Sequence, residues 1–128
     1  MNADPLAPAA VDRVSDSKVG WLTTIRPDGS PHTTPVWFVF RDPTIAIVSA
    51  ASNVKVRNIR GDSRVSIAID GSAAAPLVAQ GTAELAPMTG AHERAFSEKY
   101  DGWNIADESV DGPRVVVEVR VDRWLLRA

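Results

Sequence analysis

The sequence contains no cysteine, which excludes a disulfide framework, a thiol nucleophile and a sulfur-ligated metal site. Only two of its 128 residues are histidines, and neither an HExxH nor an HxxxH spacing occurs, so we expect no protein-held metal. The GxSxG nucleophile elbow, the GxxxxGKS/T phosphate loop and the GxGxxG dinucleotide fingerprint are missing as well. With these catalytic sets absent, no side chain is predicted to be catalytic.

Low net charge and the absence of long apolar runs exclude further classes of protein. The net charge is only −2 and the isoelectric point is about 5.6, which argues against a nucleic-acid partner. No apolar run approaches the roughly 20 residues of a membrane helix, and the N-terminal MNADPLAPAAVDRV lacks the apolar core of a signal peptide. We therefore expect a cytoplasmic protein without a membrane partner. The length predicts one domain, residues 1–128, with a flexible lead-in over residues 1–8.

What the sequence does contain is a series of short strand-like segments. Runs rich in apolar and β-branched residues, separated by turn residues, predict six strands: 19–25, 32–40, 44–49, 64–70, 77–85 and 114–126. Helical patterns are present at 9–17, 52–61 and 89–100, and residues 101–113 are expected to be mostly loop. Because strands and helices do not alternate regularly, the predicted fold is mainly β, a six-stranded antiparallel barrel with two or three short helices.

The stretch SAASNVKVRNIRG, residues 49–61, carries Lys55, Arg57 and Arg60 and no acidic residue. With Ser52 as the expected N-cap, Lys55 falls in the first helical turn, where a cation opposes the helix macrodipole at a cost of about 0.3–1 kcal/mol. A phosphate bound at this helix start would turn the cost into an attraction and satisfy free backbone N–H groups. The alternative is a solvated basic face, and the pattern alone gives the two interpretations equal weight.

The stretch HTTPVWFVF, residues 32–40, places Pro35 inside a strand pattern. Proline cannot donate to a strand ladder, so Pro35 is expected at a sheet edge, at a bulge, or where the backbone faces something other than a strand. Together with Thr33, Thr34 and Trp37, it would offer a surface for a planar heterocycle. In the alternative interpretation, Trp37 is a core aromatic and Pro35 protects an edge strand.

The predicted loop over residues 101–113 holds several acidic residues, for which a solvated surface is a simpler interpretation than a paired-carboxylate site. Trp103, in the same loop, is either an interface or lid residue or is buried beneath its own loop. The candidate site thus combines phosphate donors with an aromatic platform and has no evident nucleophile or base. This combination indicates that a bound cofactor carries the chemistry.

The order of these segments resembles a known superfamily. GWLTTIRPDGSPHTTPVWFVF, then a short strand, then SAASNVKVRNIRGDSRVSIAI and VAQGTAEL is similar to the split β-barrel flavin and deazaflavin oxidoreductases related to pyridoxamine 5′-phosphate oxidase. The resemblance covers residues 19–85, and it is strongest to the actinobacterial branch of small proteins that use coenzyme F420. The K-x-R-N-I-R-x-D-x-R-V-S stretch after P-V-W-F is its most specific part. The resemblance implies an FMN-binding type of split barrel.

The resemblance also implies a homodimer with two cofactors in grooves between the subunits, and a small-molecule substrate. Its implied cofactor-binding residues are Pro35, Val36, Trp37, Ser49, Ala50, Ser52, Lys55, Arg57, Asn58 and Gln80. Trp103 and Arg127 are implied to close the site of the partner subunit. The C-terminal VDRWLLRA does not display a clear basic site for a substrate phosphate, which argues against pyridoxamine phosphate oxidation itself.

The activity implied by the resemblance is an F420H₂-dependent reductase that transfers a hydride between F420 and an unsaturated small organic substrate. Lys55 and Arg57 in a short chain favour F420 over FMN. An FMN-dependent oxidoreductase on the same fold and a flavin- or F420-binding protein without turnover remain alternatives.

Overall fold

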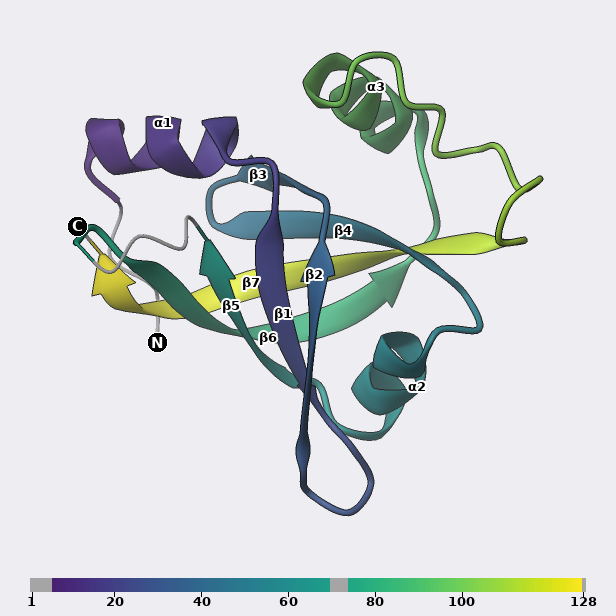
Figure 1. Cartoon of the computed structure of the whole chain (residues 1–128), viewed down its shortest axis with the longest axis horizontal. Coiled ribbons are helices and arrows are strands. Elements are labelled where there is room, and N and C mark those ends of the chain that lie inside the picture. The colour runs from purple at the N-terminus through teal and green to yellow at the C-terminus, as the bar shows by residue number, and fades with distance from the viewer. Residues whose placement is uncertain (1–5, 70–73, 128) are drawn as a thin grey trace.

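The computed structural model describes residues 6–69 and 74–127, which form one antiparallel sheet and three helices (Figure 1). The helices are α1 (Pro8–Asp16), α2 (Val54–Gly61) and α3 (Gly90–Lys99). The strands are β1 (Gly20–Ile25), β2 (Pro31–Val36), β3 (Phe38–Arg41), β4 (Thr44–Ala50), β5 (Arg64–Ile69), β6 (Leu77–Ala86) and β7 (Arg114–Arg127). Their order in the sheet is β2-β1-β5-β6-β7-β4-β3.

This strand order produces a split barrel, which confirms the predicted fold class. The strands β2 and β3 lie at the two edges of the sheet, although only Trp37 separates them in the sequence. The sheet therefore has to curl until its two edges approach each other at Trp37.

The strand count differs from the prediction, because seven strands are present in the described segments rather than six. The segment predicted as one strand over 32–40 is divided at Trp37. Val36 is the last residue to pair with β1, and Phe38 is the first to pair with β4. The chain thus leaves β1 and pairs with β4 after a single unpaired residue. The hydrophobic pattern over residues 32–40 gives no sign of this change of partner strand.

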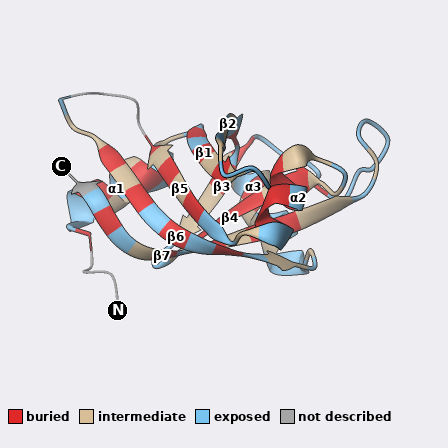
Figure 2. Cartoon of the chain, turned by 90° about the horizontal axis from the view of Figure 1, so that it is seen from below, coloured by how far each residue is buried: buried red, intermediate tan, exposed pale blue. Residues whose placement is uncertain are grey.

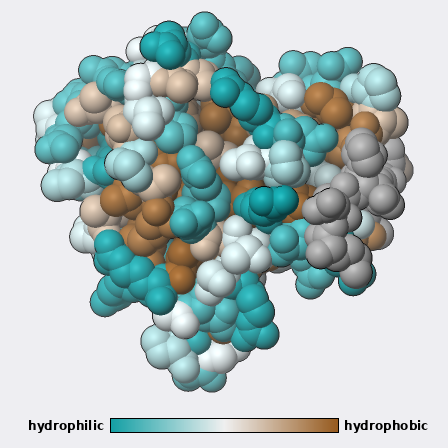
Figure 3. Space-filling model, turned by 180° about the vertical axis from the view of Figure 1, so that it is seen from behind, coloured by the Kyte–Doolittle hydropathy of each residue, from teal (hydrophilic) through white to brown (hydrophobic). Residues whose placement is uncertain are grey.

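Strand alternation builds the core. Successive residues of β6 alternate between buried and exposed, as the bands in Figure 2 show. Buried residues from β1, β3, β4 and β5, such as Leu22, Phe38, Ile45 and Ile67, meet inside the curled sheet. Hydrophobic residues also reach the surface on the face shown in Figure 3, so the helices leave part of the apolar surface uncovered.

The helices α1 and α2 lie at opposite ends of the strands (Figure 1). Ala10 and Val14, one turn apart on α1, join the main core together with Leu6. The predicted lead-in over residues 1–8 is therefore too long, since Leu6 is buried and α1 begins at Pro8, while residues 1–5 lie outside the described part. None of the helices in the described part is long and apolar enough to cross a membrane.

The third helix, α3, covers the outer side of β3 and β4. Its N-terminus is held by a capping box, in which Thr89 and His92 bond to each other's backbone N–H groups. At its other end, Phe96 and Tyr100 form a second apolar cluster with Ile105 of the following loop. The residues from 101 to 113 are loop, as predicted.

Candidate cofactor site

The start of α2 differs from the sequence-based expectation. Asn53, rather than Ser52, is the N-cap, and its side chain accepts the Lys55 N–H at 3.4 Å. Ser52 is exposed one position earlier. The backbone N–H groups of Ala51 and Asn53 bond to Pro113 and Ala50 oxygens, so several donors of this run are already used. An anion at this helix start would therefore depend mainly on side chains.

Lys55 is the unusual side chain at this helix start. Only 8% of its surface is exposed, and its ammonium has no hydrogen-bond or ion-pair partner among residues 6–69 and 74–127. Burial lowers the pKa of Lys55 below its ordinary value. A partly desolvated cation without a counter-charge is unfavourable, and a bound anion would remove that penalty.

Asn58, one turn after Lys55 on α2, connects the helix to the barrel. Its amide nitrogen donates to the Thr24 hydroxyl at 3.0 Å, and both side chains are buried. In the β1–β2 ladder Thr24 lies opposite His32, and Thr34 is the next residue of β2 on the same face. His32 Nδ1 and Thr34 Oγ1 are buried without a hydrogen-bond partner in the described structure.

We call these five residues, Thr24, His32, Thr34, Lys55 and Asn58, the interior polar cluster. Three of them carry polar groups that the described chain leaves unpaired, which fits a polar ligand at this end of the barrel. Thr34 was expected from the sequence only as part of the surface around Pro35, and His32 was not assigned to the site. The two-residue period of β2, which places both with Val36 on the inward face, was the available signal.

Trp37 is not a core residue. It is 47% exposed, and its ring lies parallel to that of Tyr100 with centroids 4.7 Å apart. Trp103 meets Trp37 edge to face at 5.0 Å, and Phe96 packs against both Tyr100 and Trp103. We call Trp37, Phe96, Tyr100 and Trp103 the aromatic shelf. Because Tyr100 covers only one face of the indole, the shelf offers a platform for a planar ring.

The Tyr100 hydroxyl fixes the shelf to the split in the barrel. It accepts the Phe38 N–H at 2.8 Å, and the carbonyl oxygens of Phe38 and Lys18 lie 2.9 and 2.8 Å away as acceptors for its proton. Trp103 contacts the guanidinium of Arg114 of its own chain at 5.4 Å. In the single chain, Trp103 therefore belongs to its own shelf. The side chain of Arg127, which was assigned to the same closing role, lies outside the described part.

Other predicted residues gather at the same end of β4. Phe38 pairs with Ile47, so Trp37 lies beside the strand end that holds Ser49 and Ala50. The Ser49 hydroxyl is buried and donates to the Ala50 carbonyl at 3.1 Å, and Ala50 itself pairs with β7. Only a small part of the surface of Ser49 and Ala50 is therefore available to contact a ligand.

The alternation of β2 separates Pro35 from Val36. Pro35 is exposed on the edge strand, as predicted, whereas the Val36 side chain is buried in the core. Gln80 is exposed on the outer face of β6, opposite Ser66, and does not meet the other predicted residues within one chain. The bulge predicted at Gly81 is present, and a Cβ atom there would lie 2.4 Å from the Arg120 carbonyl oxygen.

Arg57 and Asn58 line a pocket of about 420 Å³ beside the β1–β2 hairpin, which we call the hairpin pocket. Arg26 and Arg64 also line it. Arg64 is paired with Asp62, whose pKa its hydrogen bonds lower to about 2. Arg26 donates to the Pro31 carbonyl at 2.7 Å. Arg57 has no partner in the described chain and is available to an anion.

A curled antiparallel sheet whose two edges meet at Trp37, with an aromatic shelf at that junction, defines a split β-barrel protein. The family model described as pyridoxamine 5′-phosphate oxidase matches residues 6–128. The chain therefore belongs to this family.

Solved structures agree with this assignment. An F420 reductase is 25% identical, with a TM-score of 0.75 over 91% of this chain and 95% of that one. A conserved hypothetical protein of Mycobacterium tuberculosis is 26% identical, also with a TM-score of 0.75, over 97% and 89% of the two chains. The heme storage protein of Vibrio cholerae shares the fold at 16% identity, with a TM-score of 0.75 over 99% and 96%.

Proposed function

We propose that the protein is an F420H₂-dependent reductase, in which the bound deazaflavin supplies a hydride to an unsaturated small organic substrate. The observation that carries this proposal is Lys55 of the interior polar cluster, a side chain that is only 8% exposed and whose ammonium has no counter-charge among the described residues. An anionic ligand group would compensate for the desolvation of this cation. Membership of the family adds a redox cofactor as the source of that group.

The residues of the chain act by binding and positioning. Lys55 holds the cofactor phosphate, and Asn58, fixed by its bond to Thr24, borders the same space. The open face of Trp37 packs against a planar ring, and the backbone around Pro35 and Val36 lines its edge. Correct placement of two reactants accounts for up to about 7–11 kcal/mol of a barrier.

The hairpin pocket favours F420 over FMN as the cofactor. FMN ends at its phosphate, whereas the side chain of F420 continues beyond the phosphate into carboxylates. Asn58 belongs to the interior polar cluster and also lines the hairpin pocket, so the two lie next to each other. The unpartnered guanidinium of Arg57 supplies a positive charge there for an acidic tail.

A homodimer completes the proposed site. Paired residues on neighbouring strands form one row across the outer face of the sheet. In order they are Pro35 of β2, Trp21 of β1, Ala68 of β5 and Val78 of β6. Trp21 is 50% exposed, and no helix of the described chain covers this row. A second copy placed on this face would bring Gln80 toward the cofactor of its neighbour, with Trp103 and Arg127 as further closing residues.

A spectroscopic titration of the protein with F420 and with FMN tests the function. We expect F420 to bind at micromolar concentration. Replacing Lys55→Met should weaken binding of both cofactors about tenfold or more, because a charge-assisted contact is lost. Replacing Arg57→Gln should weaken F420 more than FMN. The matched control is Arg94→Gln, an exposed arginine on α3 that lies outside both the cluster and the hairpin pocket.

The possible outcomes separate the alternatives. If neither cofactor binds at micromolar concentration, or if Lys55→Met binds like the wild type, the proposal is wrong. Tight binding of FMN alone would assign the FMN-dependent activity. Binding of F420 without oxidation of F420H₂ by enones, quinones or nitro compounds would assign a binding protein without turnover.

A further inference from the structure

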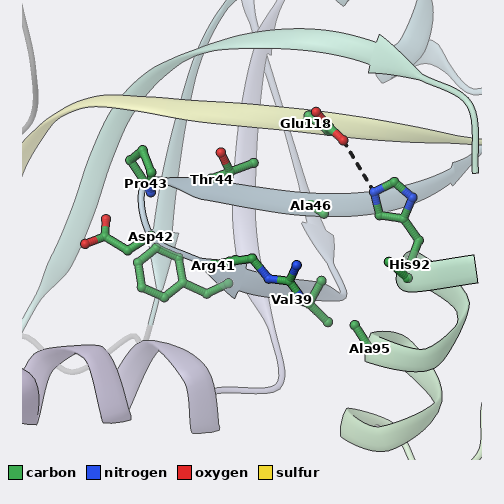
Figure 4. A pocket seen from close by; sticks show the side chains of 11 residues that line it. Val39, Arg41, Asp42, Pro43, Thr44, Ala46, His92, Ala95 and Glu118 are labelled. Carbon is green, nitrogen blue, oxygen red and sulfur yellow. Dashed lines mark ion pairs between the residues drawn. The ribbon is translucent and has the colours of Figure 1, made fainter. Parts of the chain in front are cut away.

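A second pocket lies between α3 and the hairpin of β3 and β4 (Figure 4). It has a volume of about 420 Å³, within the range of small-molecule sites. It is at the Thr44 end of β4, whereas Ser49 and Ala50 lie at the other end, roughly 20 Å away at the rise of a strand. We call it the α3 pocket.

Small side chains create the space. Ala91 and Ala95 are one turn apart on α3 and therefore lie on one face of the helix. Both line the pocket together with Ala46 of β4, and Val39 of β3 adds a further apolar wall. Where larger residues would bring α3 into contact with the sheet, three alanines leave a hollow with an apolar floor.

One side of the pocket presents a fixed carboxylate. Glu118 Oε1 lies 3.3 Å from His92 Nε2, as the dashed line in Figure 4 marks. The Thr89 N–H donates to His92 Nδ1 at 3.0 Å, which places the ring proton on Nε2, toward Glu118. The second oxygen of Glu118 has no partner among the residues described.

This carboxylate also faces a like charge. Glu84 of β6 lies directly opposite Glu118 in the β6–β7 ladder, and no hydrogen bond or ion pair within the described chain neutralises it. Like charges in opposite positions of a ladder repel each other. Arg120, two residues along β7 on the same face, forms no ion pair with either glutamate in the described chain, so the second oxygen of Glu118 is open to a positively charged ligand group.

The positive charge in the α3 pocket is that of Arg41 on β3. Arg41 lines the pocket and has no hydrogen-bond or ion-pair partner within the described ranges. Its side chain extends along β3 toward Val39, whereas Asp42 points the other way (Figure 4). Arg41 and Glu118 line one pocket without forming an ion pair, so their charges are separated by the space between them.

We propose that the α3 pocket binds a free α-amino acid with an apolar side chain. Its carboxylate binds Arg41, its ammonium binds Glu118, and its side chain packs on the alanine-lined floor. A purely anionic ligand would be repelled by Glu118 and Glu84, and a purely cationic one by Arg41. A zwitterion satisfies both sides at once. This site does not depend on the proposed cofactor.

Isothermal titration calorimetry of the full-length protein with leucine, valine and methionine tests the proposal. We expect saturable binding of at least one of them at up to millimolar concentration. N-acetyl-leucine, which lacks the ammonium, and leucinamide, which lacks the carboxylate, should bind at least about tenfold more weakly. This comparison of ligands needs no variant and remains decisive if a substitution impairs folding.

Variants then locate the site. Arg41→Gln and Glu118→Gln should each weaken binding about tenfold or more, and Ala95→Leu should block it by filling the hollow without changing a charge. The matched control Arg94→Gln, on the same helix but outside the pocket, should bind like the wild type. Absence of saturable binding for all three amino acids overturns the proposal. Binding that none of the three pocket variants alters overturns it as well.

Discussion

Two lysines of this protein are largely removed from water, and their surroundings differ. Lys55 faces the interior polar cluster, where a ligand anion can neutralise it. Lys99, at the end of α3, lies against aromatic rings, with its amine 3.7 Å from the ring centre of Phe38 and 5.5 Å from that of Tyr100. The Lys99 amine is buried and has no hydrogen-bond partner in the described structure. Burial, with a smaller contribution from Lys18, lowers its pKa from 10.5 to about 8.

This lowered pKa predicts a pH dependence of stability. Between pH 8 and pH 10.5 the unfolded chain holds the Lys99 proton more tightly than the folded chain does, so the unfolded state binds more protons. The Lys99 contribution to the free energy of unfolding should therefore rise as the pH is raised through this window. Urea denaturation of the wild type and of Lys99→Met between pH 7 and pH 10.5 measures the difference.

The comparison of the wild type with Lys99→Met isolates the contribution of Lys99, because the two proteins share all other titrating groups. The wild type should gain stability relative to Lys99→Met as the pH rises above 8. A constant difference across the window would show that Lys99 titrates at the same pH in both states.

At the scale of elements, the junction of β2 and β3 decides where the aromatic shelf lies. Trp37 belongs to neither ladder, and the Phe38 backbone next to it is held by the Tyr100 hydroxyl, 62 residues further along the chain. Without that hydroxyl, the Phe38 N–H would remain buried without a partner. The end of α3 thus positions the strand junction as well as the ring beneath Trp37.

Tyr100→Phe removes this hydroxyl and keeps the ring. We expect it to lower the free energy of unfolding by about 1–3 kcal/mol, the usual cost of leaving a buried donor unsatisfied. Urea denaturation at neutral pH measures the change. The control is Thr23→Val, which removes an exposed hydroxyl pair with Thr33 and should stay within about 0.5 kcal/mol of the wild type. An equally small effect of Tyr100→Phe would mean that water replaces the hydroxyl at the junction.

At the scale of the molecule, the helices of the described structure cover the ends and one side of the curled sheet, and none of them covers the outer face of β1, β2 and β5. On this face the exposed indole of Trp21 lies between Pro35 and Ala68. An exposed apolar row of this kind is typical of an interface. In the proposed homodimer it is buried by the second copy.

Trp21→Ser should therefore shift the protein toward monomers, because a large apolar contact is lost at the centre of the proposed interface. Light scattering after size-exclusion chromatography measures the mass at several concentrations. Val110→Ser, which changes a side chain that is 85% exposed in the loop before β7, is the control and should leave the mass unchanged. A wild type that is monomeric at high micromolar concentration would contradict the dimer, and F420 affinity should fall together with the dimer population.

Local chemistry let the sequence predict most of the elements. The two-residue period of β5 and β6, the Pro-Asp-Gly turn between β1 and β2, and the glycine bulge at Gly81 each depend on a few neighbouring residues. The same local patterns, taken in order, carried the resemblance to the split-barrel family, which the family match confirms. Lys55 stood out because a cation in a first helical turn is unfavourable wherever the helix lies.

Only the tertiary structure decided how these parts meet. The curl of the sheet divides one expected strand at Trp37, because the edges β2 and β3 have to approach each other there. It also brings Tyr100 under Trp37, buries Lys55 near Asn58, and places Arg41 and Glu118 on one pocket. These contacts join residues that are far apart in the sequence. Their energies depend on spatial distances, which a pattern of neighbouring residues cannot predict.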